Sequence, residues 1–399
     1  MIDPSKFKKY IDEAFSKERS IVLRYHPAIY SDSLVLSNLR ETSLGEGVRF
    51  FKLATYKGVD IFLLDETTLM QTGTYKSIDG CIYAALSRKR DFPKIAFSSG
   101  ANTGMALTLY AQRFGIETFF FHPKTTLFKI NGSWFRNPLS HLITLDRDER
   151  QVKEAAKIFS GLLAIPNGLE SNLRFLGSKC RALAICEEMF KNNIKFSYIT
   201  QTVCAGFGPI GVYKMFSQLV AENILKREDI PRFLGVQQRA ISPMVIAWKE
   251  KRDYLANTNG DSKELPIEPA LYNTFPSQTY PEMYKLLIEF GGELISISKE
   301  DYQKYSDLFI LYLLKSGLKL TEIILDGKKE LLEKAGVIAG AGVLKSIESG
   351  LIKKKAKVLC CFTGGIIKDF VPLLSPQYEI KKDGSLEKEI KEYIKSTLE

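Results

Sequence analysis

The chain has 399 residues, of which 45% are hydrophobic and 26% charged, so it can build hydrophobic cores and is neither fibrous nor disordered. Its length predicts two domains or one large interleaved body. A net charge of +10 suits anionic ligands. Because no basic tract carries a nucleic-acid recognition motif and no apolar run approaches roughly 18 residues, we expect neither nucleic acid nor membrane as a partner.

The cysteines and histidines exclude further classes of protein. Six cysteines lie mostly in apolar runs and none forms a CxxC pair, which favours reduced, buried thiols. The three histidines lie outside any motif for a zinc site or a Ser-His-Asp triad. His122 follows three phenylalanines and is expected at the end of a strand. The N-terminus lacks the apolar core of a secretory signal, and a cytoplasmic protein is therefore expected.

The first predicted element is an amphipathic helix with Asp3 as N-cap and Pro4 at the first helical position. A strand is predicted within residues 56–66, and a helix follows Thr74. Strands and helices then alternate to the C-terminus, with strands at residues 95–97, 116–123, 140–146, 233–237 and, in KVLCCF, 357–362. This alternation predicts an α/β fold with mostly parallel sheet and helices on both faces.

In such sheets a ligand binds at the carboxyl ends of the strands, where loops lead into helix N-termini. Three glycine turns occupy that position, at residues 98–104 (SSGANTG), 204–211 (CAGFGPIG) and 362–365 (FTGG). The second can approach a phosphate closely but fits neither GxGxxG nor GxxxxGKS. The first offers hydroxyls, an amide and bare backbone, which suit a carboxylate or a phenolate. Each turn by itself is also what an ordinary strand-to-helix connection needs.

Lys76, in TGTYKSID, is predicted just inside a helix N-terminus, the unfavourable end of the dipole for a cation. Burial and the dipole both lower the pKa of an ammonium, and a partly neutral lysine is a nucleophile toward an aldehyde. An ordinary surface lysine is the alternative interpretation.

Taken together, the motifs resemble a known family. In order and spacing, TGTYKSIDG, SSGANTG, CAGFGPIG and CFTGGIIKD are similar to the signature of the fold type II pyridoxal-phosphate enzymes, in the branch of threonine synthase, with cysteate synthase and cysteine synthase as relatives. TSLGEG at residues 42–47 is similar to the family's TPLGEG. The resemblance runs from about residue 40 to 370. It implies a tryptophan synthase β-like architecture of two interleaved parallel-sheet domains.

The resemblance also implies roles for individual residues. Lys76 would hold pyridoxal 5'-phosphate as a Schiff base and then act as acid and base on the substrate. Asn102 would bind the phenolic oxygen of the cofactor, and Thr363 its pyridine nitrogen. The cofactor phosphate would be held by Ala205, Gly206, Phe207 and Gly208. The substrate would be bound by Ser98, Ser99, Gly100, Ala101 and Thr103.

The same resemblance implies a division into domains. Residues 1–86 plus 200–399 would form the large cofactor-binding domain. Residues 87–199 would form a small, mobile domain on the substrate side, with the cofactor between the two. Relatives are typically homodimers.

The leading hypothesis is a cytoplasmic enzyme of amino-acid biosynthesis. It would carry out β- or γ-elimination or replacement on an amino acid with a leaving group such as phosphate, in the manner of threonine synthase or cysteate synthase. Lys124, Lys129, Arg136 and Arg174 are candidate contacts of a substrate phosphate.

The chain also departs from the family's pattern. Ser77-Ile78 follows the lysine where relatives carry Asp-Arg, and Ala101 is an extra residue. Residues 338–342 (IAGAG) stand where relatives show Glu-Pro-Ala, and the nearest acid is Glu333. These departures keep a second hypothesis open, in which the protein is a catalytically altered member that acts as a binding or regulatory module.

Overall fold

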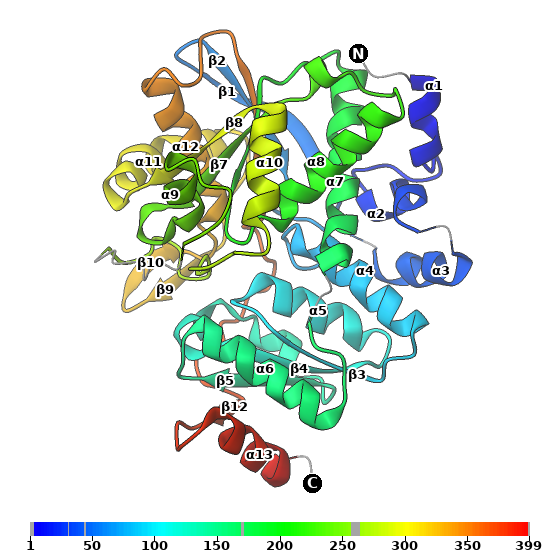
Figure 1. The fold of residues 1–399 in the computed structure, drawn as a ribbon, viewed down its shortest axis with the longest axis vertical. Helices are drawn as coiled ribbons and strands as arrows, with labels where there is room; N and C mark the ends of the chain where they lie inside the picture. Colours follow the sequence, from blue (N-terminus) through cyan, green and yellow to red (C-terminus); the bar gives the residue numbers. More distant parts are fainter. Residues whose placement is uncertain (1–3, 31, 44, 169–170, 257–263, 398–399) are drawn as a thin grey trace. The chain divides into compact units, whose positions relative to one another are not determined.

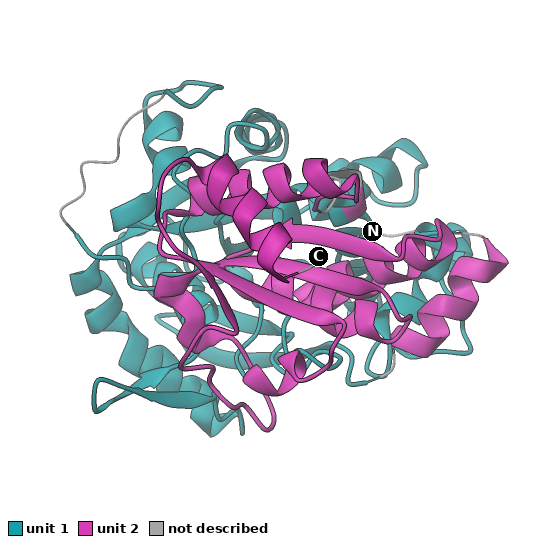
Figure 2. Cartoon of the chain, turned by 90° about the horizontal axis from the view of Figure 1, so that it is seen from below, with its two compact units in different colours: residues 1–31, 45–75, 174–366 teal, residues 32–44, 76–173, 367–399 magenta. Residues whose placement is uncertain are grey.

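The computed structural model describes residues 4–30, 32–43, 45–168, 171–256 and 264–397, and its elements are labelled in Figure 1. The chain forms two compact units, coloured in Figure 2: residues 1–31, 45–75 and 174–366 form the first, and residues 32–44, 76–173 and 367–399 the second.

The first unit is built on a six-stranded sheet of order β1-β2-β11-β6-β7-β8. All neighbouring strands are parallel except β1 and β2, which form an antiparallel hairpin. The strands of this sheet are β1 (Arg49–Tyr56), β2 (Val59–Asp65), β6 (Tyr198–Thr202), β7 (Arg232–Gln238), β8 (Gly292–Ile297) and β11 (Lys357–Phe362). A separate hairpin pairs β9 (Glu322–Leu325) with β10 (Lys328–Leu331).

Helices cover both faces of this sheet. On one face, α11 and α12 pack their apolar residues against alternate side chains of β2, β7 and β11. On the other, Tyr213 of α8 contacts Phe233 of β7 and Phe290 of α10. The helices of the first unit are α1 (Pro4–Phe7), α2 (Ile21–Arg24), α7 (Ser171–Lys191, from Arg174 onward), α8 (Phe207–Ala221), α9 (Pro243–Lys249), α10 (Tyr280–Phe290), α11 (Lys299–Lys315) and α12 (Ala335–Glu348).

The second unit has a four-stranded parallel sheet of order β12-β5-β4-β3. Consecutive phenylalanines of β4 point to opposite faces, as strand geometry requires. Phe119 and Phe121 pack with α6 and α13, whereas the Phe120 ring lies against Gly104 of α5. The elements of this unit are α3 (Ser33–Thr42), α4 (Lys76–Lys89), β3 (Lys94–Ser98), α5 (Asn102–Gln112), β4 (Glu117–Pro123), β5 (Ser140–Leu145), α6 (Glu149–Leu163), β12 (Tyr378–Ile380) and α13 (Leu386–Thr397).

Short 3₁₀ segments complete the secondary structure of the described residues. They are η1 (Lys8–Tyr10), η2 (His26–Ala28), η3 (Lys124–Lys129), η4 (Gly132–Phe135), η5 (Arg227–Asp229) and η6 (Arg239–Ile241).

The predicted α/β class with parallel sheet and helices on both faces is confirmed. The N-terminal helix was predicted to carry Phe7, Tyr10, Ile11 and Ala14 on one face, and this length was wrong: α1 ends at Phe7 and a 3₁₀ turn follows. The expected N-cap, Asp3, lies outside the described residues. The sequence prediction also missed β1, which is paired with β2 through a tight turn at Lys57 and Gly58.

The compact units are divided at residues other than 86 and 199, and the expected domain boundaries stay a prediction. Helix α4 belongs with the second unit because it packs on α5, and the C-terminal residues join the same unit because β12 pairs with β5. The small, mobile domain on the substrate side stays a prediction.

The small-residue segment 338–342 lies inside α12 and is buried. A Cβ at Gly340 would meet the ring of Phe309 at 2.4 Å, and one at Gly342 would meet Val236 at 2.6 Å. These residues are therefore small because α12 packs closely on α11 and on β7. The acid Glu333 lies just before this helix and is 5% exposed.

Five of the six free cysteines are buried, as predicted, and Cys204 is partly exposed.

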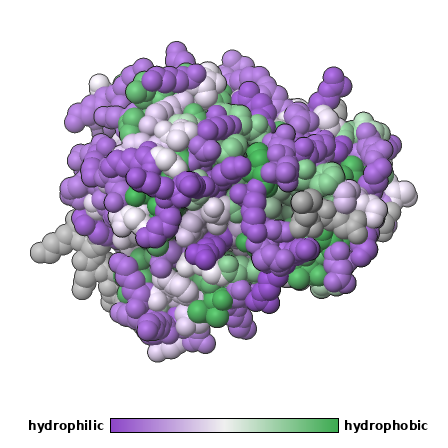
Figure 3. Space-filling view, turned by 90° about the horizontal axis from the view of Figure 1, so that it is seen from above, coloured by the Kyte–Doolittle hydropathy of each residue, from purple (hydrophilic) through white to green (hydrophobic). Residues whose placement is uncertain are grey.

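Within the described part of the chain, no helix is both long and apolar enough to cross a membrane. The face drawn in Figure 3 is covered mainly by hydrophilic residues, with small hydrophobic patches between them.

A buried ion pair lies at the carboxyl edge of the first unit's sheet. Arg181 of α7 is 1% exposed, and its Nε and Nη2 atoms donate to the two carboxylate oxygens of Glu66 at 2.7 and 2.8 Å. Its Nη1 donates to Oε1 of Gln201 at 3.0 Å, and its guanidinium lies 4.7 Å from the ring centre of Tyr75. Burial alone would lower the pKa of Arg181, but the Glu66 carboxylate outweighs it and raises that pKa.

We expect Arg181→Met to lower the free energy of unfolding by about 3–5 kcal/mol, because it leaves the Glu66 carboxylate buried without its partner. The double variant Arg181→Met, Glu66→Leu removes both charges and is expected to lose less than the single variant. Urea unfolding followed by circular dichroism measures both losses.

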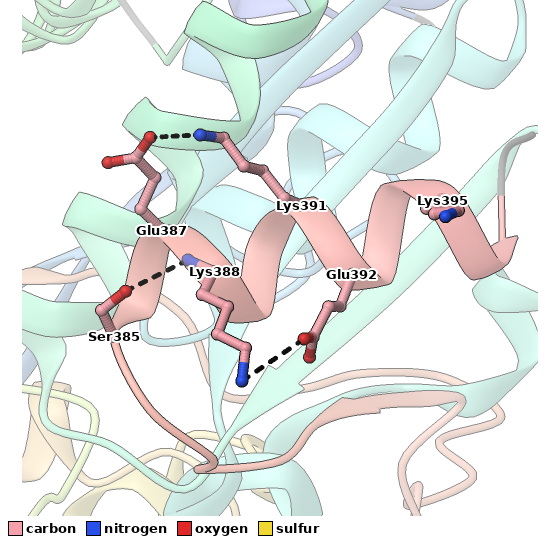
Figure 4. A pocket seen from close by; sticks show the side chains of 6 residues that line it. All are labelled: Ser385, Glu387, Lys388, Lys391, Glu392 and Lys395. Atoms are coloured by element: carbon pink, nitrogen blue, oxygen red, sulfur yellow. Dashed lines mark hydrogen bonds and ion pairs between the residues drawn. The ribbon is translucent and has the colours of Figure 1, made fainter.

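An exposed ion pair provides the control. Glu387 and Lys391 pair at 2.6 Å across one turn of α13, on a solvent-facing surface (Figure 4). Glu387→Gln is expected to leave the urea midpoint unchanged, because water screens this pair. If Glu387→Gln and Arg181→Met lowered the free energy of unfolding by similar amounts, the buried pair would not matter more to stability than an exposed one.

Candidate active site

Lys76 is the first residue of α4, at the positive end of the helix, as the sequence predicted. Its side chain is 16% exposed, and Nζ lies 3.1 Å from Oδ2 of Asp79, one turn further along the helix. The Asp79 side chain is 3% exposed. Ser77 and Ile78, which follow the lysine in place of the family's charged pair, are fully buried. The structure therefore places a largely buried lysine beside one buried carboxylate.

Helices α4 and α5 touch near their N-termini. A Cβ at Gly80 would lie 2.8 Å from the carbonyl carbon of Ala106, so only glycine allows this approach. Gly80 and Ala106 each come four residues after the first residue of their helix, which are Lys76 and Asn102. Both helices therefore begin about one turn before their point of contact.

The segment 98–104 links the end of β3 to the start of α5. Ala101 is 3% exposed and is the N-cap residue, and its N–H donates to Oγ of Ser99 at 3.3 Å. The first N–H groups of α5 have no partner within the helix. The Oδ1 atom of Asn102 is buried and has no hydrogen-bond partner. An amide in that state is suited to a ligand's polar group.

His122 and Thr126 lie beneath this segment. His122 is fully buried near the end of β4, as the sequence predicted, and its Nδ1 atom is 2.9 Å from the carbonyl oxygen of Ser99. Thr126 Oγ1 is 3.2 Å from Nε2 of His122 and also 3.2 Å from the carbonyl oxygen of Gly100.

In the first unit, Thr363 follows β11 and holds the residue that precedes the lysine. The N–H of Tyr75 donates to the carbonyl oxygen of Thr363 at 3.0 Å, and Thr74 forms an isolated bridge with Gly364. The end of β11 therefore fixes the backbone that leads directly into Lys76.

The predicted phosphate turn, residues 205–208, leads from β6 into α8. Gly206 is the N-cap of α8 and has a φ of +81°, a conformation that favours glycine. A Cβ at Gly208 would lie 3.1 Å from Nε2 of Gln201, 3.3 Å from Nη1 of Arg181 and 3.4 Å from the Tyr75 hydroxyl. The turn therefore packs against polar side chains, including that of the residue next to Lys76. Pro209, the third residue of α8, contributes no N–H.

The four candidate phosphate contacts have different surroundings. Lys124 pairs with Glu379 at 2.6 Å, Lys129 is 2% exposed, and Arg136 is exposed. The guanidinium of Arg174 lies 4.4 Å from the ring centre of Phe207, at the start of α8. Of the four, the structure places Arg174 against the phosphate turn.

The sequence prediction missed several residues around these motifs. Tyr75 precedes Lys76 in the motif, and Arg181 is a single arginine in the apolar run CRALAIC, which was a usable signal for a buried ion pair. Thr126 carried no signal, because its contacts with residues 100 and 122 depend on how η3 packs under the loop.

A protein-family model described as "Pyridoxal-phosphate dependent enzyme" matches residues 37–364. The chain belongs to this family. Among curated proteins, cysteate synthase of Methanospirillum hungatei is 26% identical over 170 residues, 41% of this chain and 36% of the relative. Threonine synthase of Methanocaldococcus jannaschii is 21% identical over 307 residues, 75% of this chain and 68% of the relative. The chain thus matches only about a third of the first relative's length.

Among solved structures, a threonine deaminase from T.th. is similar in fold, with a TM-score of 0.59 and 14% identity. The match covers 86% of this chain and all of the other. This confirms the fold type II resemblance of the sequence.

Membership of the family makes pyridoxal 5'-phosphate the cofactor, and the residues present fit it. Lys76 offers a largely buried amine for the aldehyde. The amide of Asn102, whose buried Oδ1 atom has no partner, suits the phenolic oxygen, since its oxygen and nitrogen ends can exchange by a flip. The turn at Gly206 presents backbone at a helix N-terminus, which suits a phosphate.

The titration of His122 is expected to make stability depend on pH. Burial lowers the pKa of His122 to about 4, whereas an imidazole in the unfolded chain titrates near pH 6.5. The unfolded state therefore takes up the proton first, and stability is lost as the pH falls from about 6.5 to 4. This group should lower the free energy of unfolding by about 3 kcal/mol between pH 7 and pH 4.

Urea unfolding of the wild type and of His122→Asn across this pH range measures the effect. The variant should show a shallower pH dependence, with the carboxylates shared by both proteins cancelling in the comparison. Identical pH slopes would show that folding does not lower the pKa of His122.

Proposed function

We propose that this protein is an enzyme that eliminates or replaces a phosphate leaving group at Cβ or Cγ of a small amino acid. The synthesis of a threonine-like or cysteate-like product, in cytoplasmic amino-acid biosynthesis, follows from that chemistry. The observation that carries the proposal is the placement of Lys76: it is largely buried at the start of α4, and its neighbour Tyr75 is held by Thr363.

In this proposal Lys76 would hold the aldehyde carbon of the cofactor through Nζ, and its free amine would move the proton at the substrate Cα. The cofactor, when bound, supplies the electron sink that stabilises negative charge at Cα. Asp79 lies 3.1 Å from Nζ and holds the amine in place when Lys76 is not covalently engaged.

The other predicted residues take the roles that the resemblance implies. Asn102 binds the phenolic oxygen, and the turn of residues 205–208 binds the cofactor phosphate. The hydroxyl of Thr363 meets the ring nitrogen. A neutral hydroxyl leaves that nitrogen without a proton, which favours elimination and replacement over transamination. The residues of segment 98–103 hold the substrate carboxylate.

Two observations support a phosphate-bearing substrate. The chain has a net charge of +10, which favours anionic substrates. The curated proteins similar to this chain include ones named threonine synthase and cysteate synthase.

Lys76→Ala is expected to abolish covalent cofactor binding, because no other amine replaces Nζ at that position. Wild-type protein with added pyridoxal 5'-phosphate should turn yellow and, after borohydride, carry the cofactor mass on the peptide containing residue 76. Lys89→Ala, at the opposite end of the same helix, is the matched control and should behave as the wild type. If the wild type stays colourless, the alternative of a binding or regulatory module replaces the enzyme.

The substrate class is tested by phosphate release. We expect the wild type to release inorganic phosphate from O-phospho-L-homoserine with water, which gives threonine, or from O-phospho-L-serine with sulfite, which gives cysteate. In each case the C–O bond to phosphate breaks and a C–O or C–S bond forms. O-acetyl-L-serine carries an ester that is uncharged in the substrate and leaves as acetate. Faster reaction with the acetyl compound would overturn the assignment of phosphate.

A further inference from the structure

The buried side chains of His122 and Thr126 contact two backbone carbonyls of the loop at residues 98–104. Nδ1 of His122 is 2.9 Å from the Ser99 oxygen, and Oγ1 of Thr126 is 3.2 Å from the Gly100 oxygen. Both side chains are at most 2% exposed. The two consecutive carbonyls therefore point into the unit's interior, toward β4 and η3.

Hydrogen positions follow from the chemistry of the partners. A carbonyl oxygen can only accept, so Nδ1 of His122 carries the ring proton. Burial keeps the ring neutral near pH 7, so Nε2 is an acceptor. The single proton of the Thr126 hydroxyl is shared between Nε2 and the carbonyl oxygen of Gly100, each 3.2 Å from Oγ1. His122 and Thr126 thus form one unit that binds both carbonyls.

Holding the carbonyls inward orients the N–H groups. In a trans peptide the C=O and the N–H point in opposite directions, so the N–H groups of Gly100 and Ala101 point away from the buried pair. The N–H of Ala101 donates to Oγ of Ser99, which leaves the Ser99 proton available for another acceptor. The exposed side of the loop then carries donors and no competing carbonyl.

We propose that His122 and Thr126 are positioning residues, which turn the carbonyls of residues 99 and 100 inward so that the substrate's α-carboxylate meets only hydrogen-bond donors. This inference rests on the proposed function, in which segment 98–103 binds that carboxylate. It also gives a role to the extra residue Ala101, since the additional peptide is the one whose carbonyl Thr126 holds.

The test compares two ligands that differ only in the carboxylate. L-Alanine and L-alaninamide are titrated into the holoenzyme, and the concentration at half-maximal spectral change of the bound cofactor is measured. In Thr126→Val the affinity for L-alanine is expected to fall by about tenfold, because a released carbonyl can face the carboxylate. The affinity for L-alaninamide should change by no more than about twofold.

Conservative variants separate positioning from folding. Thr126→Ser keeps the hydroxyl and should retain the wild-type preference for L-alanine. His122→Asn keeps a donor near the position of Nδ1 and should retain more of that preference than His122→Leu. A purely structural role would weaken both ligands together, and equal losses for L-alanine and L-alaninamide would overturn the inference.

The same experiment distinguishes a failure of the proposed function from a failure of the inference. If wild-type protein binds no pyridoxal 5'-phosphate, or its bound cofactor responds to neither ligand, the proposed function is overturned and the inference falls with it. If the wild type prefers L-alanine and Thr126→Val keeps the same preference, only the inference is overturned.

Discussion

The buried charge pair of Arg181 and Glu66 is the interaction on which the polar cluster around Tyr75 in the first unit depends. Its guanidinium joins the end of β2, the helix α7 and Gln201 of β6, and it stacks on Tyr75. A buried ion pair is tolerated only when nearly every donor is satisfied, and here both carboxylate oxygens and the amide of Gln201 take part. The backbone that enters Lys76 is therefore held by a rigid, polar cluster.

In the second unit, hydrogen-bond donors are presented by a loop that has no positively charged side chain. The loop at residues 98–104 carries no charge, and its buried support is the neutral His122. Close packing of α4 on α5 at Gly80 sets where both helices begin. In the proposed function, backbone groups and hydroxyls of this loop bind a carboxylate, and the amine of Lys76 serves the aldehyde.

The departures from the family's pattern have physical explanations of their own. Ser77 and Ile78 are fully buried in α4, and the glycines of α12 are required by the rings and branched side chains packed on them. Packing therefore explains the residues at these positions, whereas Lys76, Asn102 and Thr363 match the family's pattern. That pattern supports the proposed enzyme over the alternative of a binding module.

The sequence by itself determined the family, the α/β class, the start of α4 at Lys76 and the three glycine turns, because each depends on residues that are neighbours in the sequence. It missed β1 and β12 and predicted too long an N-terminal helix, since isolated strands and helix ends depend on what they pair with. Only the tertiary structure decided the partners of Arg181 and His122. Glu66 and Arg181 are 115 residues apart, and no local pattern shows which distant carboxylate a buried charge will meet.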